Sequence, residues 1–169
     1  KDLSGEWGDL KDQARLRKDN LHDAHNQQRF NDNAKDLLLW ASGVKRTLAS
    51  AEMPHDIKSA EIMLKTHDEV LDDIKAHKEK IKSTRALGKD IVAKNPKATD
   101  VSDKVKKLED EEKAIDDLWA ARQKQLQDAY NLQIFNREAD QIDAVTSSHE
   151  AFLDFDDMGS TVDDVDGLF

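Results

Sequence analysis

The sequence contains no cysteine, and its 169 residues include only two prolines and six glycines. The absence of cysteine excludes a disulfide framework and is typical of proteins in a reducing compartment. Strands and tight turns would need more glycine, proline and β-branched residues, so the composition predicts an all-α fold. No apolar run approaches the roughly 20 residues that cross a bilayer, and the N-terminal KDLSGEWGDL does not have a signal-peptide pattern. We therefore expect a soluble, intracellular protein with no direct membrane insertion.

Charged residues make up 37% of the chain, and the formal net charge is -10. Nothing forms the stripe of net positive charge that nucleic acid or an anionic membrane surface would require, so we expect no nucleic-acid partner. Lys75, Lys78 and Lys82 recur on one predicted helix and could form a weak patch for lipid or an acidic partner. They are interleaved with Asp72 and Asp73, and this mixture of signs favours an ordinary solvated face.

The chain repeats itself with a period of 105 residues. At that offset QRFNDNA (28–34) lies over QIFNREA (133–139), and the ungapped match extends across residues 1–64 and 106–169. Further identical pairs at the same offset include Glu6/Glu111, Arg17/Arg122, Leu21/Leu126, Asp23/Asp128, Ala24/Ala129 and Asn26/Asn131. Such self-similarity predicts an array of similar structural units, each of which packs mainly against its neighbours.

Within each unit the apolar residues step by three and four, which places them on one face of a helix. Breaks are few: Pro54 and Pro96 each end one helix before the next begins, and no comparable break lies between residues 101 and 152. The third helix of one unit should therefore run straight into the first helix of the next. The predicted helices, named C, A, B in repeating order, are C about 3–29, A about 30–50, B about 56–94, C about 101–133, A about 134–153 and the start of B at 160–169.

These helices predict three segments. Residues 1–29 would be helix C of a preceding repeat, residues 30–134 one complete three-helix repeat, and residues 135–169 helix A and the start of helix B of a following repeat. Because a lone amphipathic helix cannot bury its own apolar stripe, we expect both ends to be parts of a longer chain. A simple coiled-coil tether without repeats is disfavoured by the breaks at Pro54 and Pro96.

Local motifs follow the order of these helices. Phe30 opens helix A and Trp40 follows ten residues later. Helix B is DIKSAEIMLKTHDEVLDDIKAHKEKI, it is closed by ALGKDIVAKNP, and helix C contains LWAARQKQLQDAYNLQIF. In this order and at this period the motifs resemble the spectrin repeat, and the resemblance covers the whole chain. It departs from the family at two positions of the second copy. Val145 replaces the helix A tryptophan. The helix C tryptophan, which is Trp7 in the first copy, is Glu112 in the second, where Trp119 appears one heptad later.

The resemblance implies an all-α fold of tandem three-helix spectrin-type bundles joined by continuous C-to-A helices. It also implies a structural rod segment of a membrane-skeleton protein, which acts as an elastic spacer and as part of an actin cross-linking scaffold. Such chains pair laterally with an antiparallel partner chain and reach actin and membrane adaptors through other parts of the full-length protein. The implied location is the cytoplasmic cytoskeleton at the inner face of the plasma membrane. An alternative function is a repeat pair that docks one specific adaptor.

The apolar stripes and the resemblance together predict two sets of structural residues. The predicted core is Trp7, Phe30, Trp40, Leu64, His67, Leu71, Ile115, Trp119, Leu126 and Phe135. The predicted linker between repeats, which should be helical and transmit rigidity, contains Ala129, Gln133, Ile134, Phe135 and Ala139.

Residue types that carry out catalysis are present, but they are not in a catalytic arrangement. His22 and His25 have a spacing that can hold zinc, yet no third ligand is signalled nearby. Carboxylate pairs such as Asp72 and Asp73 lie on highly charged helices, and a three-helix rod offers no obvious cleft to shift their pKa values. No cysteine nucleophile and no glycine-rich phosphate loop occurs. We predict that the chain is not an enzyme and holds no cofactor or metal ion.

Overall fold

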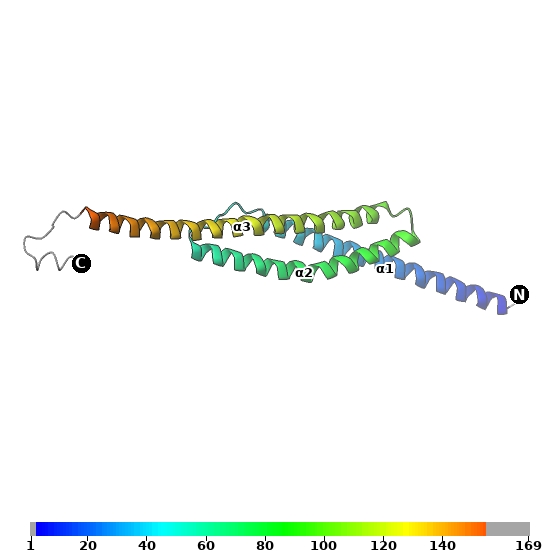
Figure 1. Cartoon of the computed structure of the whole chain (residues 1–169). Helices are drawn as coiled ribbons and strands as arrows, with labels where there is room; N and C mark the ends of the chain where they lie inside the picture. The colour runs from blue at the N-terminus through cyan, green and yellow to red at the C-terminus, as the bar shows by residue number, and fades with distance from the viewer. Residues whose placement is uncertain (1–2, 155–169) are drawn as a thin grey trace, which may run out of the picture.

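The computed structural model describes residues 3–154, which form three helices joined by two short loops (Figure 1). The helices are α1 (Leu3–Leu48), α2 (Ile57–Lys94) and α3 (Thr99–Leu153). No strand occurs among the described residues. With 55 residues, α3 is about 80 Å long at 1.5 Å per residue.

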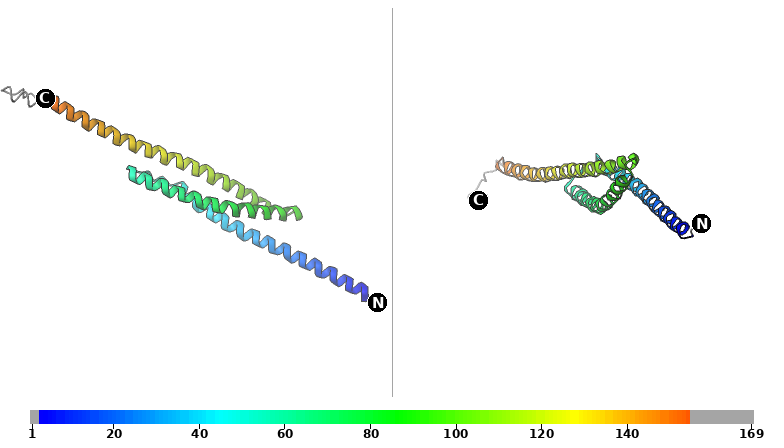
Figure 2. Two further views of the ribbon diagram at one scale, coloured as in Figure 1. Left: turned by 60° about the horizontal axis from the view of Figure 1, so that its bottom comes forward. Right: turned by 90° about the vertical axis from the view of Figure 1, so that its right-hand side faces the viewer.

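The three helices overlap only in the middle of the molecule, where each packs against the other two. Figure 2 shows that the N-terminal part of α1 extends beyond this bundle at one end and the C-terminal part of α3 extends beyond it at the other. The burial pattern has the same limits, because buried residues on α1 begin at Phe30 and those on α3 end at Ala129. The prediction of an all-α fold with a three-helix bundle and continuous long helices is therefore confirmed.

A capping box at the N-terminus of α2 marks where the loop between α1 and α2 ends. Asp56 has an extended backbone, and its carboxylate accepts a hydrogen bond of 2.6 Å from the backbone N–H of Ser59. The Ser59 hydroxyl accepts in return from the backbone N–H of Asp56 at 3.1 Å, so the two residues form a capping box. The backbone N–H of Ser59 lowers the pKa of the Asp56 carboxyl.

The helix ends differ slightly from the predicted ones. Helix A was expected to reach residue 50, but α1 ends at Leu48, and α3 begins at Thr99 instead of residue 101. The end of α2 is where the sequence predicts it: Lys94 is its last residue, and Pro96, which disfavours helix at the residue before it, follows two residues later. The predicted helix B start at 160–169 lies outside the described residues.

The core of the bundle consists of two buried clusters. The first contains Phe30, Ala34 and Leu37 of α1 with Ile81 of α2 and residues of α3. The second lies nearer the loop between α1 and α2, and it contains Ala41, Val44, Leu48, Ile74 and Ile115. Trp40 packs against both clusters and therefore links them.

Helix α2 passes very close to α1 and α3 at Gly88. A β-carbon built on Gly88 would lie 2.5 Å from Cγ2 of Val105 and 2.6 Å from Cε2 of Phe30. Glycine is therefore required there by the space between the helices. Gly43 of α1 is different, because a β-carbon at that position would meet nothing within 4 Å.

Candidate functional site

The two tryptophans of the bundle each stack on a histidine of α2. The Trp40 and His77 rings lie 4.0 Å apart at an interplanar angle of 9°. Trp40 Nε1 donates a hydrogen bond of 2.8 Å to Asp73 Oδ2, and His77 Nδ1 donates to the Asp73 carbonyl at 2.9 Å. These contacts tie α1 to α2 at one side of the bundle.

Trp119 and His67 make the corresponding tie between α3 and α2. Their rings lie 4.9 Å apart and nearly parallel, at 10°. His67 Nε2 donates to the Trp119 carbonyl at 3.0 Å, which fixes the tautomer, and Trp119 Nε1 donates to the His67 carbonyl at 3.3 Å. The His67 residue is 5% exposed. Burial lowers the pKa of its imidazole, so the neutral form is favoured in the folded chain.

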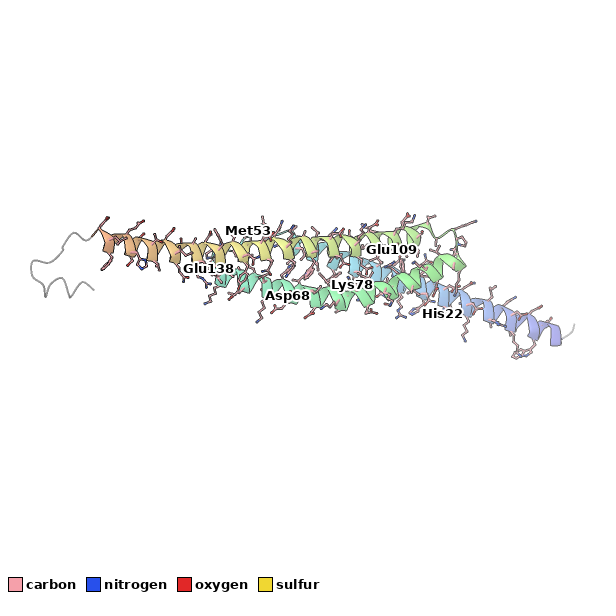
Figure 3. All side chains as sticks on the ribbon, viewed as in Figure 1. His22, Met53, Asp68, Lys78, Glu109 and Glu138 are labelled. Carbon is pink, nitrogen blue, oxygen red and sulfur yellow. The ribbon has the colours of Figure 1, made fainter. Side chains whose placement is uncertain are left out.

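Arg122 of α3 holds the loop between α1 and α2 in place. Its Nη2 donates a hydrogen bond to the backbone carbonyl of Glu52, and its Nη1 lies 3.6 Å from Sδ of Met53. The residue as a whole is only 6% exposed. Figure 3 shows Met53 beside α3. Arg122 was not among the predicted core residues. Its signal in the sequence was its place on the helix C stripe and its identity with Arg17 one repeat earlier.

Ion pairs across the bundle were also not predicted. Lys45 of α1 pairs with Glu111 of α3 at 2.6 Å, and Lys78 of α2 pairs with Asp116 of α3 at 2.8 Å. Arg85 of α2 forms a fork that contacts both Glu109 and Glu112 of α3. The Arg85 guanidinium lowers the pKa of the Glu109 carboxyl. Sequence reasoning missed these pairs because it cannot place charges of different helices opposite one another.

The predicted core residues within the bundle lie between its helices to different depths. Phe30, His67, Ile115 and Leu126 are buried. Half-buried positions are occupied by Trp40, Leu64, Leu71 and Trp119.

Two residues predicted for the core are not in it. Trp7 is 59% exposed on the extension of α1, and Phe135 is 66% exposed on the extension of α3. Each extension is a single helix, and among the described residues no second helix packs against its apolar stripe, so a core position for these two side chains stays a prediction. Exposed apolar side chains continue along both extensions, at Leu10 and Leu21 on one and Ile142 on the other.

The predicted linker residues lie on one uninterrupted helix. Ala129 is buried, Gln133, Ile134 and Ala139 are half-buried, and Phe135 is exposed. At the other end of the bundle, where α1 leaves it, α1 is joined to the end of α2 by an ion pair of 2.9 Å between Lys94 Nζ and Asp23 Oδ1. The hydrogen bond to Asp23 raises the pKa of Lys94. Both residues line a cavity of about 570 Å³, together with His22 and Ile91. Figure 3 shows His22 on the extension of α1.

Two buried polar side chains make contacts between elements: His67 holds α2 to α3, and Arg122 holds α3 to the loop between α1 and α2. Among the described residues, no helix is long and apolar enough to cross a membrane.

Comparison with known proteins identifies this architecture. The profile of the family described as the spectrin repeat matches residues 25–128, which is more than half of the chain. The chain belongs to the spectrin repeat family. This confirms the resemblance expected from the sequence.

Similar proteins are spectrin chains of both types. The chain is 32% identical over 130 residues, 76% of its length, to human spectrin beta chain, non-erythrocytic 5. It is 27% identical over 168 residues to mouse spectrin beta chain, erythrocytic, and 26% identical over 168 residues to mouse spectrin alpha chain, erythrocytic 1, in each case across 99% of its length. It spans only 4%, 8% and 7% of these three relatives, respectively. With such relatives, this spectrin-repeat chain is a structural, spectrin-like rod segment.

Proposed function

We propose that the chain serves as an elastic spacer in a spectrin-like membrane skeleton at the cytoplasmic face of the plasma membrane. The observation that carries this proposal is the continuity of α1 and α3 across both ends of the bundle. A load applied along the chain passes from one repeat to the next through helical backbone hydrogen bonds. Contacts between loops are not needed to carry it.

Elasticity would come from the linker segment 129–139 of α3. Its sequence AYNLQIFNREA contains no glycine or proline, so the helix is unbroken there. It is also rich in asparagine and glutamine, and asparagine in particular favours the helix less than alanine or leucine does. Between residue 135 and the end of α3, Ala139 is half-buried and every other residue is exposed. Such a joint is stiff at rest and yields under load before the bundle does.

We further propose that the rod pairs laterally with an antiparallel partner chain and contributes to an actin cross-linking scaffold. Contacts with actin and with membrane adaptors would be made by other parts of the full-length protein. Ion pairs join the helices of the bundle, as between Lys45 and Glu111 and between Lys78 and Asp116, which supports a structural role.

The test is Ile134→Pro in a protein extended to two complete repeats. Proline removes one backbone donor and clashes with the preceding turn, which costs about 3 kcal/mol or more in a helix interior. The wild-type pair should unfold in one shared transition, and the variant in two, as followed by circular dichroism in urea. Ile134→Ala, which keeps the helix, is the control and should keep one transition. Two independent steps in the wild type would contradict rigid coupling between repeats.

A further inference from the structure

Arg122 is a buried cation whose contacts are with neutral groups. Only 6% of the residue is exposed. Besides the contact of Nη2 with the Glu52 carbonyl, Nη1 lies 3.6 Å from Sδ of Met53 and 3.5 Å from Oε1 of Gln125. Among the described residues, Arg122 takes part in no ion pair. The guanidinium also has more N–H donors than these three contacts use.

Other bases of the bundle have acids opposite them. Lys45 pairs with Glu111 at 2.6 Å, although Lys45 is only half-buried. Arg85 is also half-buried, and it contacts two glutamates of α3. Removing a charge from water is costly unless an opposite charge compensates it, and a carbonyl or a thioether compensates it only in part. The guanidinium of Arg122, which is more deeply buried, therefore attracts an added anion.

A cavity of about 220 Å³ lies beside Arg122, where the loop between α1 and α2 meets all three helices. Its walls include apolar side chains of each helix: Leu48, Met63, Val70 and Leu126. The charge of Arg122 is therefore set against walls that are largely hydrocarbon. Figure 3 labels Met53 in the loop at this end of the bundle.

We propose that this cavity binds a small monocarboxylate with a short apolar tail. The planar fork of N–H groups on the Arg122 guanidinium matches the two oxygens of a carboxylate. The tail would lie against the apolar walls and remove them from water. A water molecule takes up roughly 30 Å³ in the liquid, so the volume of the cavity corresponds to a ligand of about six to eight non-hydrogen atoms. Butanoate and hexanoate are acids of this size.

Two other classes of ligand fit the cavity less well. An inorganic anion would pair with Arg122 but leave the apolar walls unused, and the guanidinium would repel an organic amine. His67 also lines the cavity, and burial lowers the pKa of its imidazole, so the neutral form adds no second positive charge. Glu52 is the acidic residue of the lining. It is exposed in the loop, where water screens its repulsion of the ligand.

Two-dimensional ¹H–¹⁵N NMR of the full chain, at neutral pH and constant ionic strength, tests the head group of the ligand. The probes are hexanoate, hexanol and hexylamine, which share one tail and differ in charge. Hexanoate should bind with a Kd of about 1 mM, which is within the affinity that so small a molecule can reach. Hexanol and hexylamine should each bind at least about tenfold more weakly. Acetate, which keeps the carboxylate but lacks the tail, should also bind at least about tenfold more weakly.

The same spectra locate the bound acid. Amide signals of residues 47–52, 63–70 and 122–126 should shift together as hexanoate is added, because these segments line the cavity. The exposed apolar stripes around Trp7 and Phe135 give an internal comparison, since a tail that binds any hydrocarbon surface would shift the signals there. Shifts confined to those stripes, or equal binding of hexanoate and hexanol, would overturn the proposal.

Arg17→Gln is the matched control for Arg122→Gln. Arg17 is the same residue type at the corresponding position one repeat earlier, but it is exposed on the extension of α1. Both variants remove one positive charge. Arg122→Gln should weaken hexanoate binding by about tenfold or more, and Arg17→Gln should leave it unchanged. An Arg122→Gln chain that binds hexanoate as tightly as the wild type overturns the carboxylate site.

Val70→Phe keeps Arg122 and fills part of the cavity, so it replaces Arg122→Gln if that variant does not fold by circular dichroism. Val70 is half-buried and lines the cavity from α2. The larger side chain should also weaken hexanoate binding by about tenfold. Unchanged binding would place the acid elsewhere and overturn the site. The elastic-spacer proposal is tested separately, because none of these measurements concerns the linker segment 129–139.

Discussion

Gly43 and Gly88 are both inside long helices, but the same substitution to alanine should leave the chain less stable at Gly88 than at Gly43. Alanine is favoured over glycine in a helix interior by about 1 kcal/mol, and both variants gain this. At Gly43 nothing lies within 4 Å of the added carbon, so Gly43→Ala should stabilise the chain by about 1 kcal/mol. At Gly88 the added carbon would lie 2.5 Å from Val105 and 2.6 Å from Phe30.

The cost at Gly88 follows from how little these neighbours can move. Phe30 is fully buried and Val105 nearly so, and overpacking of a tight core costs about 1–3 kcal/mol. Because the helix-propensity gain is common to both variants, the difference between them isolates that cost. Urea unfolding followed by circular dichroism should place Gly88→Ala about 1–3 kcal/mol below Gly43→Ala, with unchanged slopes. Equal stabilities would refute the close approach of α2 to α1 and α3.

Three further predictions concern the contacts between helices. Trp119→Ala should cost about 3 kcal/mol in thermal or urea unfolding, and a loss below about 1 kcal/mol would mean that the indole does not join α3 to α2. Burial lowers the pKa of His67 in the folded chain, so below about pH 6.5 the unfolded chain binds more protons at this residue than the folded chain does. The free energy of unfolding should therefore decrease as the pH falls from about 6.5 through the folded pKa. Urea midpoints at several pH values should show this fall in the wild type and less of it in His67→Gln; equal falls would contradict the assignment. Arg122→Ala leaves the Glu52 carbonyl without its donor and should cost about 1–3 kcal/mol, with faster hydrogen exchange in the loop between α1 and α2. Unchanged exchange there would show that Arg122 does not hold the loop.

Local features of the sequence were sufficient to predict the helices and the positions of the breaks between them. Pro54 and Pro96 cannot continue a helix, and Asp56 can satisfy the free N–H groups at the start of the next one, so these positions act through neighbours in the chain. The 105-residue period likewise needed only the comparison of the chain with itself. Three-and-four spacing identified which face of each helix is apolar.

The same spacing could not tell whether an apolar face is covered. Trp7 and Phe135 lie on stripes as regular as those of Phe30 and Ile115, yet the first two are exposed and the last two are buried. The difference in burial depends on whether other helices pack beside the segment of helix that carries each residue. Burial requires a partner surface, and periodicity within one segment carries no information about the partner.

By itself, the sequence determined that this protein is helical, where its helices break and that it repeats, because those properties depend on propensity, caps and spacing within one segment. Only the tertiary structure decided which side chains meet. The stacking of Trp119 on His67, the contact of Arg122 with Glu52 and the lack of space at Gly88 join residues 17 to 70 positions apart. Their geometry depends on the register and separation of the three helices. The packing of side-chain ridges into grooves fixes this register and separation only when all three helices are packed together.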